Sequence, residues 1–313
     1  MKKLMFAAAL ATAMTGFSDV NSSNIVGYMN SDCVTAEYTA SVGAFDNVGD
    51  KAVSLTDLTV SGDDCSQNLI QFLTPNGRTK KHILTEEEKV ILDTTDNEWE
   101  IVLYYVSKKE CDEWQDGTTP GWYFQDDRIM LLNVSERGLF DKDGNNEVDV
   151  AFGKGFLFRS GGTKFQLLSS GEVVKGNSEV ITPLADYTVV GNASPVDRDL
   201  GYFTVTGDDC SLNLIQFLTS NGRTKKWKFS DEEKAILDTT DTEWEMVFYY
   251  VSKAECDEWQ DGTTPGWYFQ DDRIMLLNMS EKITVKAGQG FLFRSGDAKT
   301  KLVVPGALEA NEE

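Results

Sequence analysis

The feature that most constrains this fold is a long internal repeat. Residues 61–135 and 206–280 align without a gap, and about four in five positions are identical, far above chance. The segment 155–161 returns at 290–296 after a change of offset, so the first copy carries an insertion around 137–147. Two copies of this length suit independent domains better than the short units of a solenoid.

The repeat extends upstream and sets the expected domain boundaries. Ala-Glu-Tyr-Thr at 36–39 matches Ala-Asp-Tyr-Thr at 185–188. If each copy starts shortly before these segments, the chain divides into one domain at 19–173 and a second at 174–313.

Residues 1–18 have the order of a secretory signal peptide. Lys2 and Lys3 precede an apolar, Ala-rich run, and small residues at 11–13 suit a signal peptidase. The run is shorter than the roughly 20 residues that span a bilayer. We therefore expect Sec-type export, a mature protein that is secreted, extracellular or held at the cell surface, and no membrane span.

Within each copy the residue pattern predicts mostly β structure. Asn76-Gly77 stands between two apolar runs, as is typical of a hairpin turn, because both residues tolerate positive φ. The segments 99–106, 128–134 and 155–159 are rich in aromatic and β-branched residues and are expected to be strands. Many short strands separated by turn residues favour two tandem homologous β-sandwich-like domains, with a barrel as the alternative.

One short helix is expected in each copy. Thr85-Glu-Glu-Glu88 and its counterpart at 230–233 fit a capping box with acidic residues in the first turn. The apolar residues 90–92 are then expected to pack on the sheet.

Several short motifs resemble a known group of sequences. They are Asn-Ile-Val-Gly-Tyr at 24–28, the segment 55–62, the strand-like 70–73 and Gly-Lys-Gly-Phe at 153–156. In these motifs the chain resembles uncharacterised secreted proteins of Planctomycetes–Verrucomicrobia-type bacteria. The resemblance implies secretion and a β-rich fold, and it lends no activity.

The net charge of −22 limits the partners. Such an acidic chain is expected to repel nucleic acid and anionic membrane surfaces. Cations, basic surfaces and neutral sugars remain, and a glycan or another cell-surface or matrix component is the expected partner class.

The five cysteines predict a cross-link in each copy. Cys65 and Cys111 have the same spacing as Cys210 and Cys256, and in an exported chain this favours the disulfides Cys65–Cys111 and Cys210–Cys256. The alternative is a set of buried free thiols. Cys33 is left over, either as an inert thiol or as a link between chains.

The N-terminal segment is a second candidate for self-association. Residues 24–29 have the pattern of a strand. Such a strand closes its own sheet by default, and otherwise pairs with the edge of a neighbouring molecule.

An aromatic cluster around 114–124 and 259–269 is the candidate ligand site. Gly and Pro predict a loop there, and exposed aromatic rings stack on sugars, whereas the alternative is a loop folded into the core. The candidate binding residues are Trp114, Trp122, Tyr123, Trp259, Trp267 and Tyr268.

A calcium site is a second, weaker candidate. Oxygen-bearing residues alternate along the insertion, as they do in calcium loops, although glycine falls at the fourth place and no helices are expected on either side. The candidate ligands are Asp141, Asp143, Asn145 and Glu147. The alternative is a hairpin turn at Asp143-Gly144.

Catalysis is the least favoured class, and we predict that the chain is not an enzyme. His82 is the only histidine and has no counterpart in the second copy. Paired carboxylates for a glycoside hydrolase are abundant, but any acidic protein offers them; the nearest to the aromatic residues are Asp112, Glu113, Asp126 and Asp127.

The sequence therefore favours a secreted, non-enzymatic structural or binding protein built from a duplicated β domain. A tandem carbohydrate-binding module is the competing class. A calcium-supported or disulfide-linked assembly comes third, and a glycoside hydrolase last.

Overall fold

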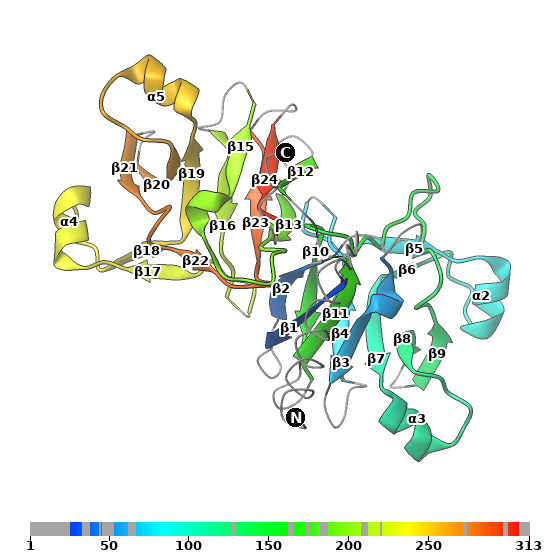
Figure 1. The fold of residues 1–313 in the computed structure, drawn as a ribbon. Helices are drawn as coiled ribbons and strands as arrows, with labels where there is room; N and C mark the ends of the chain where they lie inside the picture. The colour runs from blue at the N-terminus through cyan, green and yellow to red at the C-terminus, as the bar shows by residue number, and fades with distance from the viewer. Residues whose placement is uncertain are drawn as a thin grey trace, which may run out of the picture.

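A computed structural model describes most of the chain from residue 26 to residue 306 (Figure 1). The described ranges are 26–32, 38–43, 45, 53–61, 67–74, 76–126, 129–161, 166–172, 174, 176–181, 187–207, 212–219, 221–271, 274–296 and 300–306. The expected signal peptide at 1–18 and the residues Cys33, Cys65, Asp127 and Cys210 lie outside them.

The first copy builds two antiparallel sheets. Its strands are β1 (Val26–Asp32), β2 (Tyr38–Val42), β3 (Leu58–Ser61), β4 (Leu69–Gln71), β7 (Val102–Val106), β8 (Gly121–Asp126), β9 (Ile129–Asn133), β10 (Gly155–Arg159) and β11 (Gln166–Glu172). The small sheet has the order β1-β11-β3, and the large, six-stranded sheet has the order β2-β10-β4-β7-β8-β9.

The second copy repeats this arrangement strand for strand. Its strands are β12 (Ser178–Ile181), β13 (Tyr187–Gly191), β15 (Thr204–Thr206), β16 (Leu214–Gln216), β19 (Val247–Val251), β20 (Gly266–Asp271), β21 (Ile274–Asn278), β23 (Gly290–Arg294) and β24 (Lys301–Val304). The small sheet is β12-β24-β15 and the large sheet is β13-β23-β16-β19-β20-β21. The expectation of a mostly β fold with two homologous sandwich-like units is confirmed.

Both units also contain short two-stranded ribbons, helices and 3-10 turns. A two-stranded ribbon pairs β5 (Lys81–Ile83) with β6 (Glu98–Glu100), and its counterpart pairs β17 (Lys226–Lys228) with β18 (Glu243–Glu245). The second copy adds the pair β14 (Arg198–Asp199) and β22 (Thr284–Val285). The helices are α2 (Glu86–Ile91), α3 (Lys108–Trp114), α4 (Asp231–Leu237) and α5 (Lys253–Trp259), with single 3-10 turns η2 (Leu55–Asp57) and η3 (Leu200–Tyr202).

The expectation of one helix in each copy is wrong, because each described unit holds two α-helices. The expected capping box at the start of α2 is present, with the Thr85 hydroxyl accepting the Glu88 N–H at 3.2 Å. A second box starts α3, where Glu110 accepts the Ser107 N–H at 2.8 Å. None of the described helices has the length and apolar character to cross a bilayer.

The apolar residues of α2 do not all pack on the sheet as expected. Leu92 is buried, but Val90 is 80% exposed and Ile91 is 40% exposed. Within the helix only Glu88 is buried, and the apolar contact with the core is made by Leu92, the residue that caps the C-terminal end of α2.

The turn expected at Asn76-Gly77 is present, but it joins strands of different sheets. Gly77 has φ +78°, the Gly77 N–H donates to the Thr74 carbonyl at 2.8 Å, and Leu73 bridges Thr79. Beyond that bridge the chains separate, because β4 lies between β10 and β7 while β5 pairs with β6.

The N-terminal strand closes its own sheet. β1 runs antiparallel to β11 along its whole length, from Val26 opposite Glu172 to Asp32 opposite Gln166. The strand is therefore paired on that side within its own copy, and self-association through this segment stays a prediction.

One buried tryptophan in each unit links the large sheet to the small one. Trp122 lies in β8 of the large sheet with no exposed surface, and its indole N–H donates to the Leu58 carbonyl at 2.9 Å. Trp267 repeats this bond in the second copy, at 2.6 Å to the Phe203 carbonyl. Leu58 opens β3, so the bond links the large sheet to the small one.

The two units meet at equivalent strands. At the centre of Figure 1, β2 and β10 of the first copy lie beside β13 and β23 of the second. Gly155 faces the Val189 carbonyl, and its equivalent Gly290 faces Ala40, the equivalent of Val189. The contact therefore has approximate twofold symmetry. Val42 of the first copy even belongs to the apolar core of the second.

Glycine is required at this junction because a side chain would collide with backbone. A Cβ on Gly155 would lie 2.2 Å from the Val189 carbonyl oxygen, and one on Gly290 would lie 2.8 Å from the Ala40 carbonyl carbon. Such distances force the backbones apart.

We predict that Gly290→Val uncouples the two units. The wild-type chain should unfold in one calorimetric transition, whereas the variant should show two, with a loss of about 1–3 kcal/mol from overpacking. Gly222→Asn is the control, because Gly222 (φ +77°) has open space around it. An unchanged single transition in Gly290→Val would show that the junction carries no coupling.

Candidate functional site

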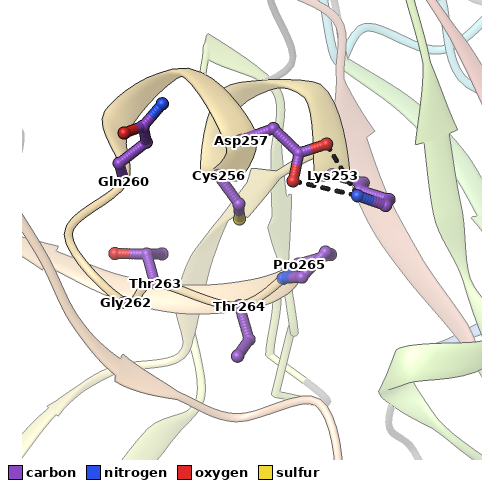
Figure 2. Close-up of a pocket in the computed structure, with 8 residues that line it drawn as sticks. All are labelled: Lys253, Cys256, Asp257, Gln260, Gly262, Thr263, Thr264 and Pro265. Carbon is purple, nitrogen blue, oxygen red and sulfur yellow. Dashed lines mark hydrogen bonds and ion pairs between the residues drawn. The ribbon is translucent and has the colours of Figure 1, made fainter.

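A hollow of about 450 Å³ lies under helix α5 of the second copy (Figure 2). The Ser252 hydroxyl accepts the Glu255 N–H at 3.2 Å to start the helix, and Gln260 ends it in the left-handed conformation. The chain then returns beneath the helix through 261–265. The hollow is lined by Lys253, Cys256, Asp257, Gln260, Gly262, Thr263, Thr264 and Pro265.

The hollow contains a thiol and an ion pair. Figure 2 shows the Cys256 sulfur pointing from the helix toward the loop. Beside it, Lys253 Nζ lies 2.6 Å from an Asp257 carboxylate oxygen. On the loop, the Asp261 carboxylate accepts the Thr263 N–H at 2.9 Å and so fixes the turn.

The surroundings of the thiol disfavour a nucleophile. Burial raises the pKa of Cys256, and the carboxylates of Glu255, Asp257 and Asp261 raise it further. Cys111 in the first copy has a pKa raised by the same causes. Since the thiolate is the reactive form, these cysteines are held in the unreactive one.

Four of the six candidate sugar-binding aromatics are part of the core. Trp122 and Trp267 have no exposed surface, and Tyr123 and Tyr268 are 6% exposed. The Tyr123 hydroxyl donates to the Thr119 carbonyl at 2.7 Å. These rings cannot present a face to a ligand. They were expected in a loop, but they lie in a buried strand, β8 in the first copy and β20 in the second.

The other two aromatic residues are at the surface. Trp114 is 40% exposed and Trp259 is 39% exposed. Each is the last residue of its helix, α3 or α5, directly before the turn. They form a matched pair of exposed indole rings, one in each copy.

The calcium candidates form a hairpin turn. The Asp141 carboxylate accepts the N–H groups of Asp143 at 2.8 Å and Asn145 at 2.9 Å. The Asn145 side chain is the main cause that lowers the pKa of Asp141, followed by its backbone N–H. Glu147 is turned toward Lys80, at 3.3 Å. This geometry matches the turn, and calcium binding stays a prediction.

The acidic residues proposed for glycoside hydrolysis are not assembled into a site. Asp112 pairs with Lys108 at 2.9 Å, one turn earlier on α3. Glu113 is exposed, the side chain of Asp126 is not described, and Asp127 lies outside the described residues. Within the described ranges, no group of three His, Cys, Asp or Glu side chains is placed to hold a metal.

His82 belongs to a buried polar network at the start of α2. Its Nδ1 accepts the Phe140 N–H at 2.9 Å, which leaves the proton on Nε2, 3.1 Å from Glu88 Oε2. Burial raises the pKa of Glu88, but the hydrogen bonds from Thr85 and His82 outweigh it, and the pKa lies below its ordinary value. Arg137 lies 3.8 Å from the same carboxylate.

The second copy keeps this network with different residues. Trp227 stands where the first copy has His82, and its indole N–H donates to Glu233 at 3.2 Å. Lys282 replaces Arg137 and lies 2.7 Å from the carboxylate. The ring at this position therefore serves as a hydrogen-bond donor to the capping glutamate. An indole can fill this role as well as an imidazole.

A second hollow, of about 630 Å³, was not anticipated from the sequence. It lies between η3 and the turn before β20, and Tyr202, 54% exposed, stands at its side. It is lined by Asp199, Gly201, Tyr202, Thr204, Tyr250, Pro265, Gly266, Ser280 and Glu281. One sequence feature could have pointed to this hollow. Residues 198–202 mostly differ from the aligned residues 53–57 of the first copy, whereas the region that follows is nearly identical in both copies.

Comparison of the chain with protein-family models, with curated proteins and with solved structures found no match.

We predict that the ring at position 82 matters through its donor. His82→Ala should lower the free energy of unfolding by about 2–3 kcal/mol, because Glu88 and the Phe140 N–H lose buried partners. His82→Trp, which copies the second unit, should cost about 1 kcal/mol less because the bond to Glu88 is kept. Urea unfolding measures both variants, and equal losses would contradict the donor role.

Proposed function

We propose that this chain is a secreted, non-enzymatic protein of the cell surface or matrix, with a structural or binding role carried by two linked β units. The observation that carries the proposal is the paired use of reactive groups in structural positions. His82 and Trp227 support capping glutamates, and Arg137 and Lys282 lie beside the same two carboxylates. The resemblance to secreted bacterial proteins and the expected signal peptide support export.

The predicted disulfides stay a proposal, because Cys111 and Cys256 are free thiols in the structure and Cys65 and Cys210 lie outside the described residues. The Asn213 carbonyl accepts the Tyr250 N–H at 3.0 Å, which fixes the chain shortly before helix α5 begins. Cys210 precedes Asn213 by three residues, a reach of about 10 Å when extended. In the first copy, the Asn68 carbonyl accepts the Tyr105 N–H at the same distance. A disulfide to Cys256 or Cys111 would contribute about 4 kcal/mol in the chain-entropy model.

We predict that the exported protein carries the disulfides Cys65–Cys111 and Cys210–Cys256. Peptide mapping without reduction should recover both linked pairs. Thiol titration after unfolding should find Cys33 as the one free thiol, or else a dimer band that Cys33→Ser removes on a non-reducing gel. Recovery of all five cysteines as free thiols would rule the cross-links out.

A specific observation supports sugar binding as a second candidate function. Trp114 and Trp259 are equivalent, exposed and adjacent to polar loops. An indole ring stacks on the apolar face of a sugar, and neighbouring carboxylates accept its hydroxyl hydrogen bonds. Two such sites in one chain bind a polymeric glycan with avidity.

We predict that glycan retention depends on both tryptophans. On an array of neutral polysaccharides, Trp114→Ala and Trp259→Ala should each weaken binding by about tenfold, and the double variant should weaken it further as avidity is lost. Ile236→Ala, which removes an apolar side chain of 50% exposure from α4, is the control. Binding that survives in the double variant would rule out these rings as the sugar site.

A further inference from the structure

The hollow beside Tyr202 combines a floor shared by both copies with a wall that only the second copy has. The floor is formed by Tyr250, Pro265, Gly266, Ser280 and Glu281. The first copy has identical residues at the equivalent positions Tyr105, Pro120, Gly121, Ser135 and Glu136.

The wall is where the copies differ. The second copy has Asp199, Gly201 and Tyr202 at the positions of Ser54, Thr56 and Asp57. In the first copy Asp57 is half-buried, and its carboxylate accepts the Ser54 N–H at 2.9 Å, at the start of its own 3-10 turn. The aromatic ring and the carboxylate of Asp199 are therefore additions of the second copy.

The missing side chain at position 201 keeps the hollow open. The Gly201 N–H donates to the Ser280 carbonyl at 2.9 Å, so backbone meets backbone there. A Cβ on Gly201 would lie 3.1 Å from the Ser280 Cβ, which is tighter than ordinary contact. Glycine thus lets η3 approach the floor without filling the space beside Tyr202.

The groups around the hollow select a neutral ligand. Arg198 lies over the Tyr202 ring, with its guanidinium carbon 5.2 Å from the ring centroid, so the ring already has a cation partner. The Arg198 guanidinium beside Tyr202 disfavours a cationic ligand at that ring, and an anionic one would meet Asp199 and Glu281 within a chain of net charge −22. Hydroxyl groups, in contrast, donate to both carboxylates.

The hollow also shares a lining residue with its neighbour. Pro265 lines both this space and the one under α5, so the two adjoin at that residue.

We propose that the hollow beside Tyr202, from here on called the groove of the second copy, binds a neutral oligosaccharide. Tyr202 stacks on one sugar ring, and Asp199 and Glu281 accept its hydroxyl hydrogen bonds. The proposal rests on the binding role proposed above. It assigns the contacts that recognise one particular sugar to the second copy. Trp114 and Trp259 then add stacking contacts that do not depend on which sugar is bound.

Isothermal titration of the full mature chain with four neutral hexasaccharides tests this assignment. The probes are cellohexaose, xylohexaose, mannohexaose and laminarihexaose. At least one should bind, and Tyr202→Asp, which restores the residue of the first copy, should raise its Kd about tenfold or more. Tyr202→Phe keeps the ring and should stay within about twofold of the wild type.

A matched pair of carboxylate variants separates the two copies. Glu281→Gln should weaken binding, whereas Glu136→Gln at the equivalent position of the first copy should leave it unchanged. Tyr202, Glu281 and Glu136 are exposed, so folding should survive, and a melting curve checks it.

The remaining outcomes overturn the proposal. A hexasaccharide whose Kd changes in Trp259→Ala but not in Tyr202→Asp would place the sugar on the tryptophans and rule out the groove. Equal effects of Glu281→Gln and Glu136→Gln would rule out the assignment to one copy. No binding by any of the four would overturn the groove and the sugar role together, and leave the structural role standing.

Discussion

A buried indole N–H bonded across two sheets holds each unit together. Trp122 and Trp267 have no exposed surface, and they donate to the carbonyls of Leu58 at the start of β3 and of Phe203 directly before β15. Leaving such a donor without an acceptor would cost about 1–3 kcal/mol, so the bond fixes how the layers meet. Each indole also packs against a tyrosine of the neighbouring strand, with ring centroids 5.0 Å and 4.9 Å apart. Most of the aromatic rings that suggest a sugar-binding loop in the sequence are therefore buried in the core.

The duplication shows which interactions the fold requires. Where the copies differ, the partner changes and the contact stays: histidine or tryptophan donates to the same capping glutamate, and arginine or lysine lies beside it. Where the copies touch, glycine meets backbone from both sides with approximate twofold symmetry. Where they face solvent beside η3, the residues have diverged, and the second copy has the new pair of Arg198 over the Tyr202 ring. The contrast indicates that the fold constrains the residues of the core and of the junction between the units. The surface residues of the second copy beside η3 are less constrained, so they can serve ligand binding.

Much of the fold could be predicted from local sequence patterns. The strand Gly155–Arg159 has the expected bounds, and the capping box at Thr85 and the turn at Gly77 are present. A second capping box, at Ser107 and Glu110, was equally visible and was missed.

Other features depend on contacts between distant residues. Local patterns do not reveal that β4 and β5 leave their shared turn for different sheets, or that Gly155 meets a strand of the other copy. The division of the tryptophans is of the same kind. Trp114 and Trp122 lie eight residues apart in similar surroundings, and only the strand pairing of β8 with β7 and β9 buries one of them.

That division can be measured directly in solution. With 5-fluorotryptophan incorporated into the full mature chain, the seven tryptophans give fluorine resonances that single Trp→Phe variants assign. A soluble gadolinium chelate should broaden the signals of Trp114 and Trp259 strongly and leave those of Trp122 and Trp267 sharp. Broadening of Trp122 or Trp267 to the extent of Trp114 would contradict the account, because the indole bond between the sheets could not then exist.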